Sequence, residues 1–140
     1  MKTAIVYFSK TGHSKKIAKA MAQNLNMEVI NIKENKKPEN VDLLFVVGGI
    51  YGGQSMPEMT NYIKSLSPTN AKKAVLMTSC TSKVTPQATI RTLLQENKIE
   101  VLEEEFICQG SFLFMGMGHP NKADFQSAID FAKKVIENQN

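Results

Sequence analysis

Short apolar runs alternate with longer amphipathic stretches along the whole chain, and this alternation limits the folds that it can adopt. The expected strands cover residues 3–9, 27–32, 41–48, 74–78 and about 103–114, the last interrupted at Gly110. The expected helices cover residues 13–25, 58–66, 85–97 and 124–137, with Pro86 in the first turn of the third. Strands that alternate with helices predict a mostly parallel sheet with helices on both faces. The chain is therefore expected to form a doubly wound α/β domain.

One connection departs from this alternation. The polar segment Lys-Glu-Asn-Lys-Lys-Pro separates the expected strands at 27–32 and 41–48. This connection is short for a full helical crossover between parallel strands. We therefore expect the helix at this point to be missing or reduced to a loop at residues 35–40.

The totals point to one globular unit, residues 1–140, because 140 residues is near the commonest domain size. No apolar run reaches the length of a membrane span, and the apolar stretch near the N-terminus is short for a secretory signal, so a cytoplasmic location is expected. Cys80 and Cys108 lack the spacing of metal ligands, and His13 and His119 are far apart. No metal centre is expected, and both thiols are expected to be reduced.

The net charge of +4 is unevenly distributed along the chain. Residues 1–70 hold nine Lys and five acidic residues, whereas the charges of residues 71–140 balance. Two interpretations stay open, a solvated surface and an attraction for an anionic ligand or an acidic partner. Nucleic acid is not an expected partner, because the Lys are scattered, Arg occurs once and no aromatic residues are interleaved with them.

The segment after the first expected strand has the residue types of a phosphate-binding loop. It consists of Ser9, Lys10, Thr11, Gly12, His13 and Ser14, directly before a helix. Its three hydroxyls can donate to phosphate oxygens, and Gly12 lets the backbone turn close to an anion. The free amides of the first helical turn point at the same place. The alternative is an ordinary helix cap by Ser or Thr, but three hydroxyls and a glycine in six residues favour phosphate.

Two further loops follow the third and fourth expected strands. The first of these loops follows Gly48 and Gly49 and contains Ile50, Tyr51, Gly52 and Gly53. The second contains Ser79, Cys80, Thr81 and Ser82. Glycines let a backbone lie against a flat ligand while Tyr51 offers a ring for stacking, although a flexible loop with an incidental Tyr is equally consistent. The short polar side chains of the second loop suit the edge of a heterocycle. No base is evident near Cys80, so a buried or ligand-lining role is favoured over a reactive thiol.

These three loops resemble the FMN-contacting loops of the flavodoxin family. The stretch Ile5–Ser14 is similar to the family signature, with Ser14 where a Thr is usual. The resemblance implies a five-stranded parallel sheet of order 2-1-3-4-5 and FMN as cofactor, with its phosphate in the first loop. It also implies an aromatic over the flavin at Tyr51, a peptide at Gly52 that flips to accept a hydrogen bond from reduced flavin N5, and a third loop at 79–82. Without an insertion in the fifth strand, the chain resembles the short-chain form.

Three features depart from that family pattern. The third loop has no Tyr or Trp, and the chain is basic where flavodoxins are usually acidic. The segment 112–120 is apolar and rich in Met. It is either the fifth strand entering the core or an exposed surface that covers the flavin or docks a partner. His119 within it is either a loop residue or a proton donor.

The residues and the resemblance together predict an FMN-binding electron-transfer protein, with the chemistry supplied by the flavin and no catalytic residue. Its partners would be redox proteins, with one reductase that has an acidic docking face as a candidate, and neither nucleic acid nor membrane is expected. The first alternative is a small FMN-dependent reductase of a quinone or similar flat acceptor, with residues 112–119 at its substrate site. The second is a flavodoxin-like interaction module without flavin. An electron carrier is favoured over a stand-alone enzyme because no second Gly-rich nucleotide motif is present.

Overall fold

The structure is a computed structural model that describes residues 1–9, 12–51, 54–80, 87–109 and 122–139. At 49–51, 54–55, 79–80, 108–109 and 122–124 it describes the backbone alone. Several expectations therefore fall outside the described residues. They concern Lys10, Thr11, Gly52, Gly53, Thr81, Ser82, Pro86, Gly110 and the segment 112–120.

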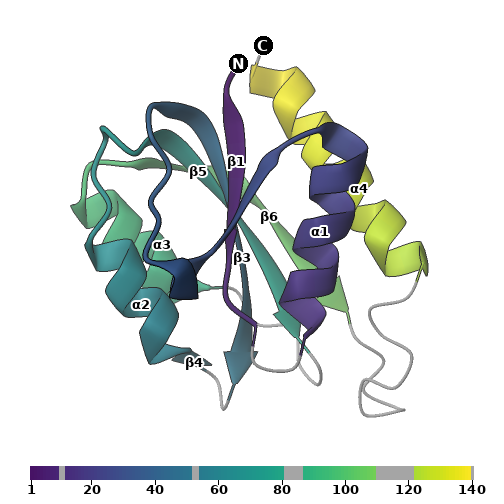
Figure 1. Ribbon diagram of the computed structural model, residues 1–140, viewed down its shortest axis with the longest axis horizontal. Helices are drawn as coiled ribbons and strands as arrows, with labels where there is room; N and C mark the ends of the chain where they lie inside the picture. Colours follow the sequence, from purple (N-terminus) through teal and green to yellow (C-terminus); the bar gives the residue numbers. More distant parts are fainter. Residues whose placement is uncertain (10–11, 52–53, 81–86, 110–121, 140) are drawn as a thin grey trace.

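Five parallel strands form the sheet (Figure 1). They are β1 (Thr3–Tyr7), β2 (Glu28–Asn31), β3 (Val41–Tyr51), β5 (Ala71–Cys80) and β6 (Glu100–Gln109). Their order is β2-β1-β3-β5-β6, and the short strand β4 (Gln54–Ser55) pairs antiparallel with the end of β3. Counting the parallel strands alone, this is the expected order 2-1-3-4-5, so the doubly wound fold is confirmed.

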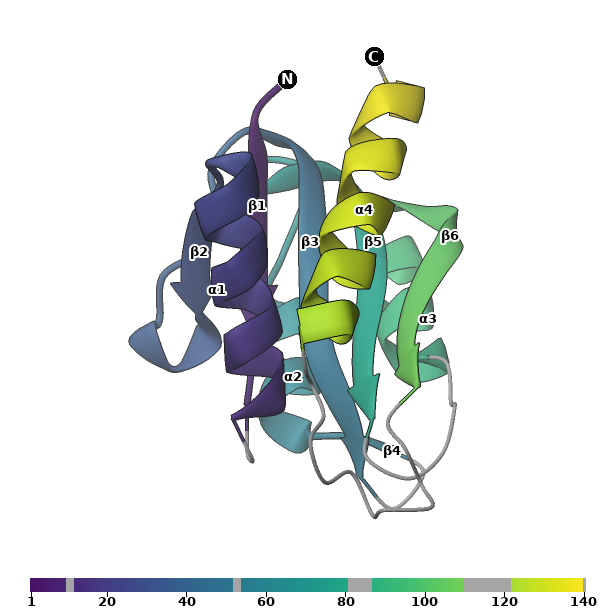
Figure 2. The same cartoon turned by 90° about the vertical axis from the view of Figure 1, so that its right-hand side faces the viewer.

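Helices cover both faces of the sheet. They are α1 (His13–Leu25), α2 (Pro57–Lys64), α3 (Ala88–Glu96) and α4 (Lys122–Gln139). Figures 1 and 2 show α1 and α4 on one face and α2 and α3 on the other. Each helix therefore buries its apolar stripe against the strands, as a doubly wound sheet requires.

Successive residues of each strand enter two separate cores. Ala4 and Val6 of β1 lie in the core under α2 and α3, while Ile5 and Tyr7 lie in the core under α1 and α4. Because both faces of a parallel strand are covered, its sequence is continuously apolar instead of alternating. A fully buried side chain such as Ile5 contributes about 1.5–3 kcal/mol of hydrophobic stabilisation.

The connection between β2 and β3 contains no full helix, as expected. It contains one 3-10 turn, η1 (Ile32–Glu34), held by a capping box. Lys33 N–H donates to Asn31 Oδ1 over 3.0 Å, and Asn31 N–H donates to Glu34 Oε1 over 3.1 Å. These reciprocal bonds satisfy backbone donors that would otherwise be orphaned at a turn this short.

Several expected boundaries were wrong by a few residues. The first strand ends at Tyr7 instead of residue 9, and β3 continues to Tyr51, three residues past its expected end, because β4 pairs with its last two residues. Strand β5 starts at Ala71 instead of residue 74, and β6 starts at Glu100 instead of about 103, across a register shift between Ala74 and Leu76. The third helix begins at residue 88 instead of 85. Pairing with a neighbouring strand determines where these strands begin and end. The apolar periodicity of the sequence does not predict that pairing.

Candidate functional site at the carboxyl edge of the sheet

The carboxyl ends of the parallel strands meet at one edge, where ligands bind in open α/β sheets. At this edge, which is lowest in Figure 1, β1 leads into α1. Phe8 N–H donates to Val47 O over 3.3 Å, so the chain stays attached to β3 for one residue beyond β1. Ser9 then ends this described segment of chain, and α1 begins at His13 with Gly12 as its N-cap.

Gly12 has the backbone geometry of an anion-binding turn. Its φ of 92° lies in the left-handed region, which glycine adopts without strain. A Cβ placed on it would meet no atom of the described residues within 4 Å, so these residues leave open space beside this backbone. Gly12 N–H donates to Ser9 Oγ over 2.8 Å, which holds the two residues together across the turn. Since the N-cap has no side chain, the first amides of α1 are not capped by it.

The electrostatics at the start of α1 are positive. The positive end of the helix dipole lies here, and the helix contains no acidic residue. Burial, followed by the charge of Lys16, lowers the pKa of His13 from its ordinary value of 6.5. His13 is therefore neutral at pH 7 and can act as a hydrogen-bonding group at this site instead of a cation. Ser14 is buried in the same first turn.

The expected second and third loops are partly strand in the structure. Ile50 and Tyr51 belong to β3, where they pair with Ser55 and Gln54. Ser79 and Cys80 belong to β5, where they pair with Cys108 and Gln109 of β6. These two expectations of loop conformation were wrong, because cross-strand pairing extends both strands. The backbones of all four residues nevertheless lie at the same carboxyl edge as Ser9 and Gly12.

A buried polar cluster at this edge was missed from the sequence. Gln87, directly before α3, is 1% exposed, and its Nε2 donates to Met77 O over 3.0 Å. Its backbone N–H donates to Glu105 Oε2 over 3.0 Å. Its Oε1 and the hydroxyl of buried Thr78 have no hydrogen-bond partner among the described residues. Buried orphaned acceptors are rare in folded proteins, so this cluster is an unusual polar environment within the core near the carboxyl edge.

The network continues into an ion pair. Arg91 Nη2 lies 3.1 Å from Glu105 Oε1, with side chains 26% and 11% exposed. Arg91 Nη1 also donates to Leu102 O over 2.9 Å. The pair joins α3 to β6 and thereby anchors the helix start that follows residues 81–86. No local sequence pattern predicts this ion pair, since Glu105 lies on β6 while its partners Arg91 and Gln87 lie in α3 and directly before it.

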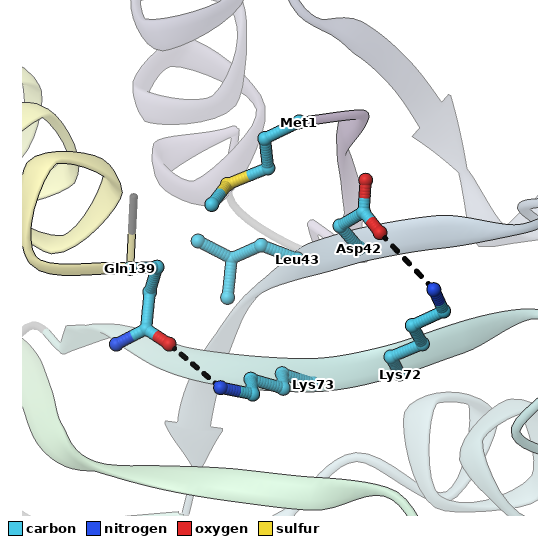
Figure 3. A pocket seen from close by; sticks show the side chains of 6 residues that line it. All are labelled: Met1, Asp42, Leu43, Lys72, Lys73 and Gln139. Atoms are coloured by element: carbon cyan, nitrogen blue, oxygen red, sulfur yellow. Dashed lines mark hydrogen bonds and ion pairs between the residues drawn. The ribbon is translucent and has the colours of Figure 1, made fainter.

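A cavity of about 270 Å³ lies at the opposite edge of the sheet, beside the chain termini (Figure 3). It is lined by Met1, Asp42, Leu43, Lys72, Lys73 and Gln139. Lys72 Nζ lies 3.5 Å from Asp42 Oδ1, and Lys73 Nζ donates a hydrogen bond to Gln139 Oε1 over 2.9 Å. With these polar groups already partnered, and far from the strand ends that carry ligands in this architecture, the cavity is not the candidate site.

Within the described part of the chain, no group of three or more His, Cys, Asp or Glu is placed to hold a metal ion. The described helices are also too short or too polar to cross a membrane.

Residues 4–122 match the sequence model of the Flavodoxin domain. The chain belongs to the flavodoxin family. A second match is an uncharacterized protein of Methanocaldococcus jannaschii, which is 33% identical over 153 residues and covers 99% of this chain and 100% of that protein.

Solved flavodoxins have the same fold. One from the domain Archaea aligns with a TM-score of 0.70 at 20% identity, over 96% of this chain and 99% of that one. A short-chain flavodoxin associated with a non-canonical PDU bacterial microcompartment aligns with a TM-score of 0.63 at 16% identity, over the full length of both chains (100%). Oxidised Flavodoxin 2 from Bacillus cereus aligns with a TM-score of 0.69 at 16% identity, over 99% of each chain.

Flavodoxin family membership implies a flavin cofactor, and the described residues fit an anionic group at the expected place. The described residues leave open space beside Gly12, the N-cap residue has no side chain, and the pKa of His13 is lowered, all of which are compatible with a phosphate at this turn. Of the residues expected there, the structure brings Ser9, Gly12, His13 and Ser14 together. The strand backbones at Tyr51 and Cys80 end at the same edge.

Proposed function

We propose that this protein binds FMN and transfers electrons between redox proteins, without a catalytic residue of its own. The observation that carries the proposal is the turn at Gly12, with its positive φ, the open space beside it and the first turn of α1 behind it. A mononucleotide such as FMN has one phosphate group, and the single glycine turn before the N-terminus of α1 offers one place to bind it. Family membership adds the flavin.

The residues would divide into two groups. Ser9, Lys10, Thr11, Gly12, His13 and Ser14 would hold the phosphate, since hydroxyls and amides donate hydrogen bonds to its oxygens. Ile50, Tyr51, Gly52 and Gly53 would lie on one side of the ring, and Ser79, Cys80, Thr81 and Ser82 along its edge. When bound, the flavin supplies the electron-transfer chemistry. The protein's part is to orient the ring, limit its contact with water and set its hydrogen bonds.

The visible spectrum of the purified protein is the first test. Oxidised flavin absorbs at about 375 and 450 nm, whatever protein holds it. Titrations of the apoprotein with FMN and with riboflavin, monitored by the quenching of flavin fluorescence, measure how much the phosphate contributes to the binding affinity. FMN should bind at least about tenfold more tightly, or about 1.4 kcal/mol, because riboflavin lacks the group that the α1 turn holds. A colourless protein that binds neither ligand would overturn the proposal, and equal affinities would remove the phosphate site.

The two alternatives predict different measurements. A quinone reductase would oxidise NAD(P)H with a quinone and no added reductase, and its expected substrate segment, residues 112–119, lies outside the described residues. A module without flavin would stay colourless after incubation with FMN. The electron carrier is proposed because it needs only the groups already present at the carboxyl edge.

A further inference from the structure

Helix α1 carries a row of uncompensated positive charge. Lys15, Lys16 and Lys19 are exposed, and α1 contains no acidic residue. Among the described residues, none of these three ammonium groups makes a hydrogen bond or an ion pair. We call these three lysines the α1 basic face.

Several basic side chains elsewhere in the described part of the chain are paired. Ion pairs join Lys36 to Glu28, Lys72 to Asp42, Lys73 to Glu100 and Arg91 to Glu105. Exposed carboxylates gather instead on β6, at Glu100, Glu103 and Glu104. Figure 2 shows α1 and β6 on opposite sides of the molecule. The carboxylates of β6 therefore lie away from the lysines of α1 and do not neutralise them.

The α1 basic face lies beside the proposed flavin site. Lys15 and Lys16 are in the first turn of α1, which begins at His13, directly after Gly12, at the carboxyl edge of the sheet. Cations in a first turn oppose the helix dipole, which favours anions there. Their position is therefore unfavourable for the isolated helix and becomes favourable when an anionic surface approaches.

We propose that the α1 basic face docks an acidic electron-transfer protein and holds it against the edge where the flavin binds. The inference that the partner is an electron-transfer protein rests on the proposed function. The inference that the partner is acidic rests on the charges of the described residues. Complementary charge raises the association rate and orients an encounter without needing a large apolar interface. Among the described residues, Met1 is the only large hydrophobic side chain that is exposed, and it lies at the opposite edge. Electrostatics is thus the attraction that this face offers.

The test compares two variants of equal charge. K15E/K16E/K19E reverses the α1 basic face, and K64E/K98E/K134E changes three exposed lysines outside α1, at the C-terminal end of α2, before β6 and in the second half of α4. Each variant has a net charge of −2 instead of +4, because every Lys→Glu change subtracts two charges. Circular dichroism checks that both fold.

The probe is a fluorescently labelled rubredoxin, a small acidic electron carrier, and binding is followed by anisotropy with apoprotein and with FMN-loaded protein. Salt at about 10 mM gives a Debye length of about 30 Å, and about 150 mM reduces it to about 8 Å. Wild type should bind at low salt and lose at least about tenfold in affinity at the higher salt. K15E/K16E/K19E should lose about tenfold or more at low salt, while K64E/K98E/K134E should change by less than about threefold.

The docking proposal would be overturned by an absence of salt-dependent binding by wild type, by an equal loss in both variants, or by equal binding of basic cytochrome c. The FMN titration of the same proteins separates the two proposals. Apoprotein that docks rubredoxin but never binds FMN would remove the proposed function and keep the docking face. A K15E/K16E/K19E variant that loses FMN but keeps rubredoxin would show that these lysines serve the phosphate instead.

Discussion

The ion pair between Arg91 and Glu105 should stabilise the protein far more than its exposed ion pairs do. Glu105 is 11% exposed and accepts from two partners, the Arg91 guanidinium at 3.1 Å and the Gln87 N–H at 3.0 Å. Arg91→Met removes the first and leaves a nearly buried carboxylate with one donor. Breaking a buried pair in this way costs about 3–5 kcal/mol.

The 26% exposure of Arg91 reduces that cost, because water already screens part of the pair. We expect Arg91→Met to lower the free energy of unfolding by about 2–3 kcal/mol. For a chain of 140 residues, 1 kcal/mol corresponds to about 3–4 °C in Tm, so the decrease should be about 6–12 °C. Since the pair anchors the start of α3, which follows residues 81–86 in the chain, the FMN affinity should fall as well.

A double-mutant cycle with Arg91→Met and Glu105→Gln, measured by urea unfolding, gives the coupling directly. The amide introduced by Glu105→Gln keeps an acceptor for the Gln87 N–H but carries no charge, so the double variant leaves no buried ion without a partner. The two changes together should therefore cost about 1–2 kcal/mol less than their sum. Lys36→Met is the matched control, since the Lys36–Glu28 pair has a similar distance of 2.9 Å but side chains 59% and 43% exposed, and its Tm should not change measurably. Additivity of the two changes within about 0.5 kcal/mol would refute the reasoning.

Three other changes test the site. Gly12→Ala places a Cβ at a φ of 92° and should cost about 1–2 kcal/mol and weaken FMN binding, as thermal unfolding and flavin titration will report. The pKa of His13 is below 6.5 in the folded protein, so the unfolded chain takes up a proton first. Stability should therefore fall as the pH drops from 6.5 toward the lowered pKa, and a His13→Gln variant with the same pH profile would contradict this. Thr78→Val removes a buried hydroxyl without a partner among the described residues, and should raise the stability of the apoprotein by about 1 kcal/mol; a lower Tm would show that the hydroxyl is satisfied.

Much of the fold follows from local pattern. Apolar runs such as residues 3–9 and 41–48 predicted strands that are buried on both faces, and the amphipathic stretch at 13–25 predicted α1 with its observed bounds. The first loop was recognised because a strand, hydroxyl residues, one glycine and a helix follow one another along the chain. Gly12 does have the positive φ that such a turn uses.

The sequence by itself therefore determined the order of the elements, the parallel sheet and the place of the glycine turn before α1, because each depends on residues that are close together in the chain. The tertiary structure alone decided where strands end and which buried polar groups meet. Tyr51 lies in β3 since Gln54 pairs with it, and Arg91 meets Glu105 since α3 packs on β6. Hydrogen bonds and ion pairs between elements depend on distances that periodicity does not contain, and so they form only once the sheet and its helices are assembled.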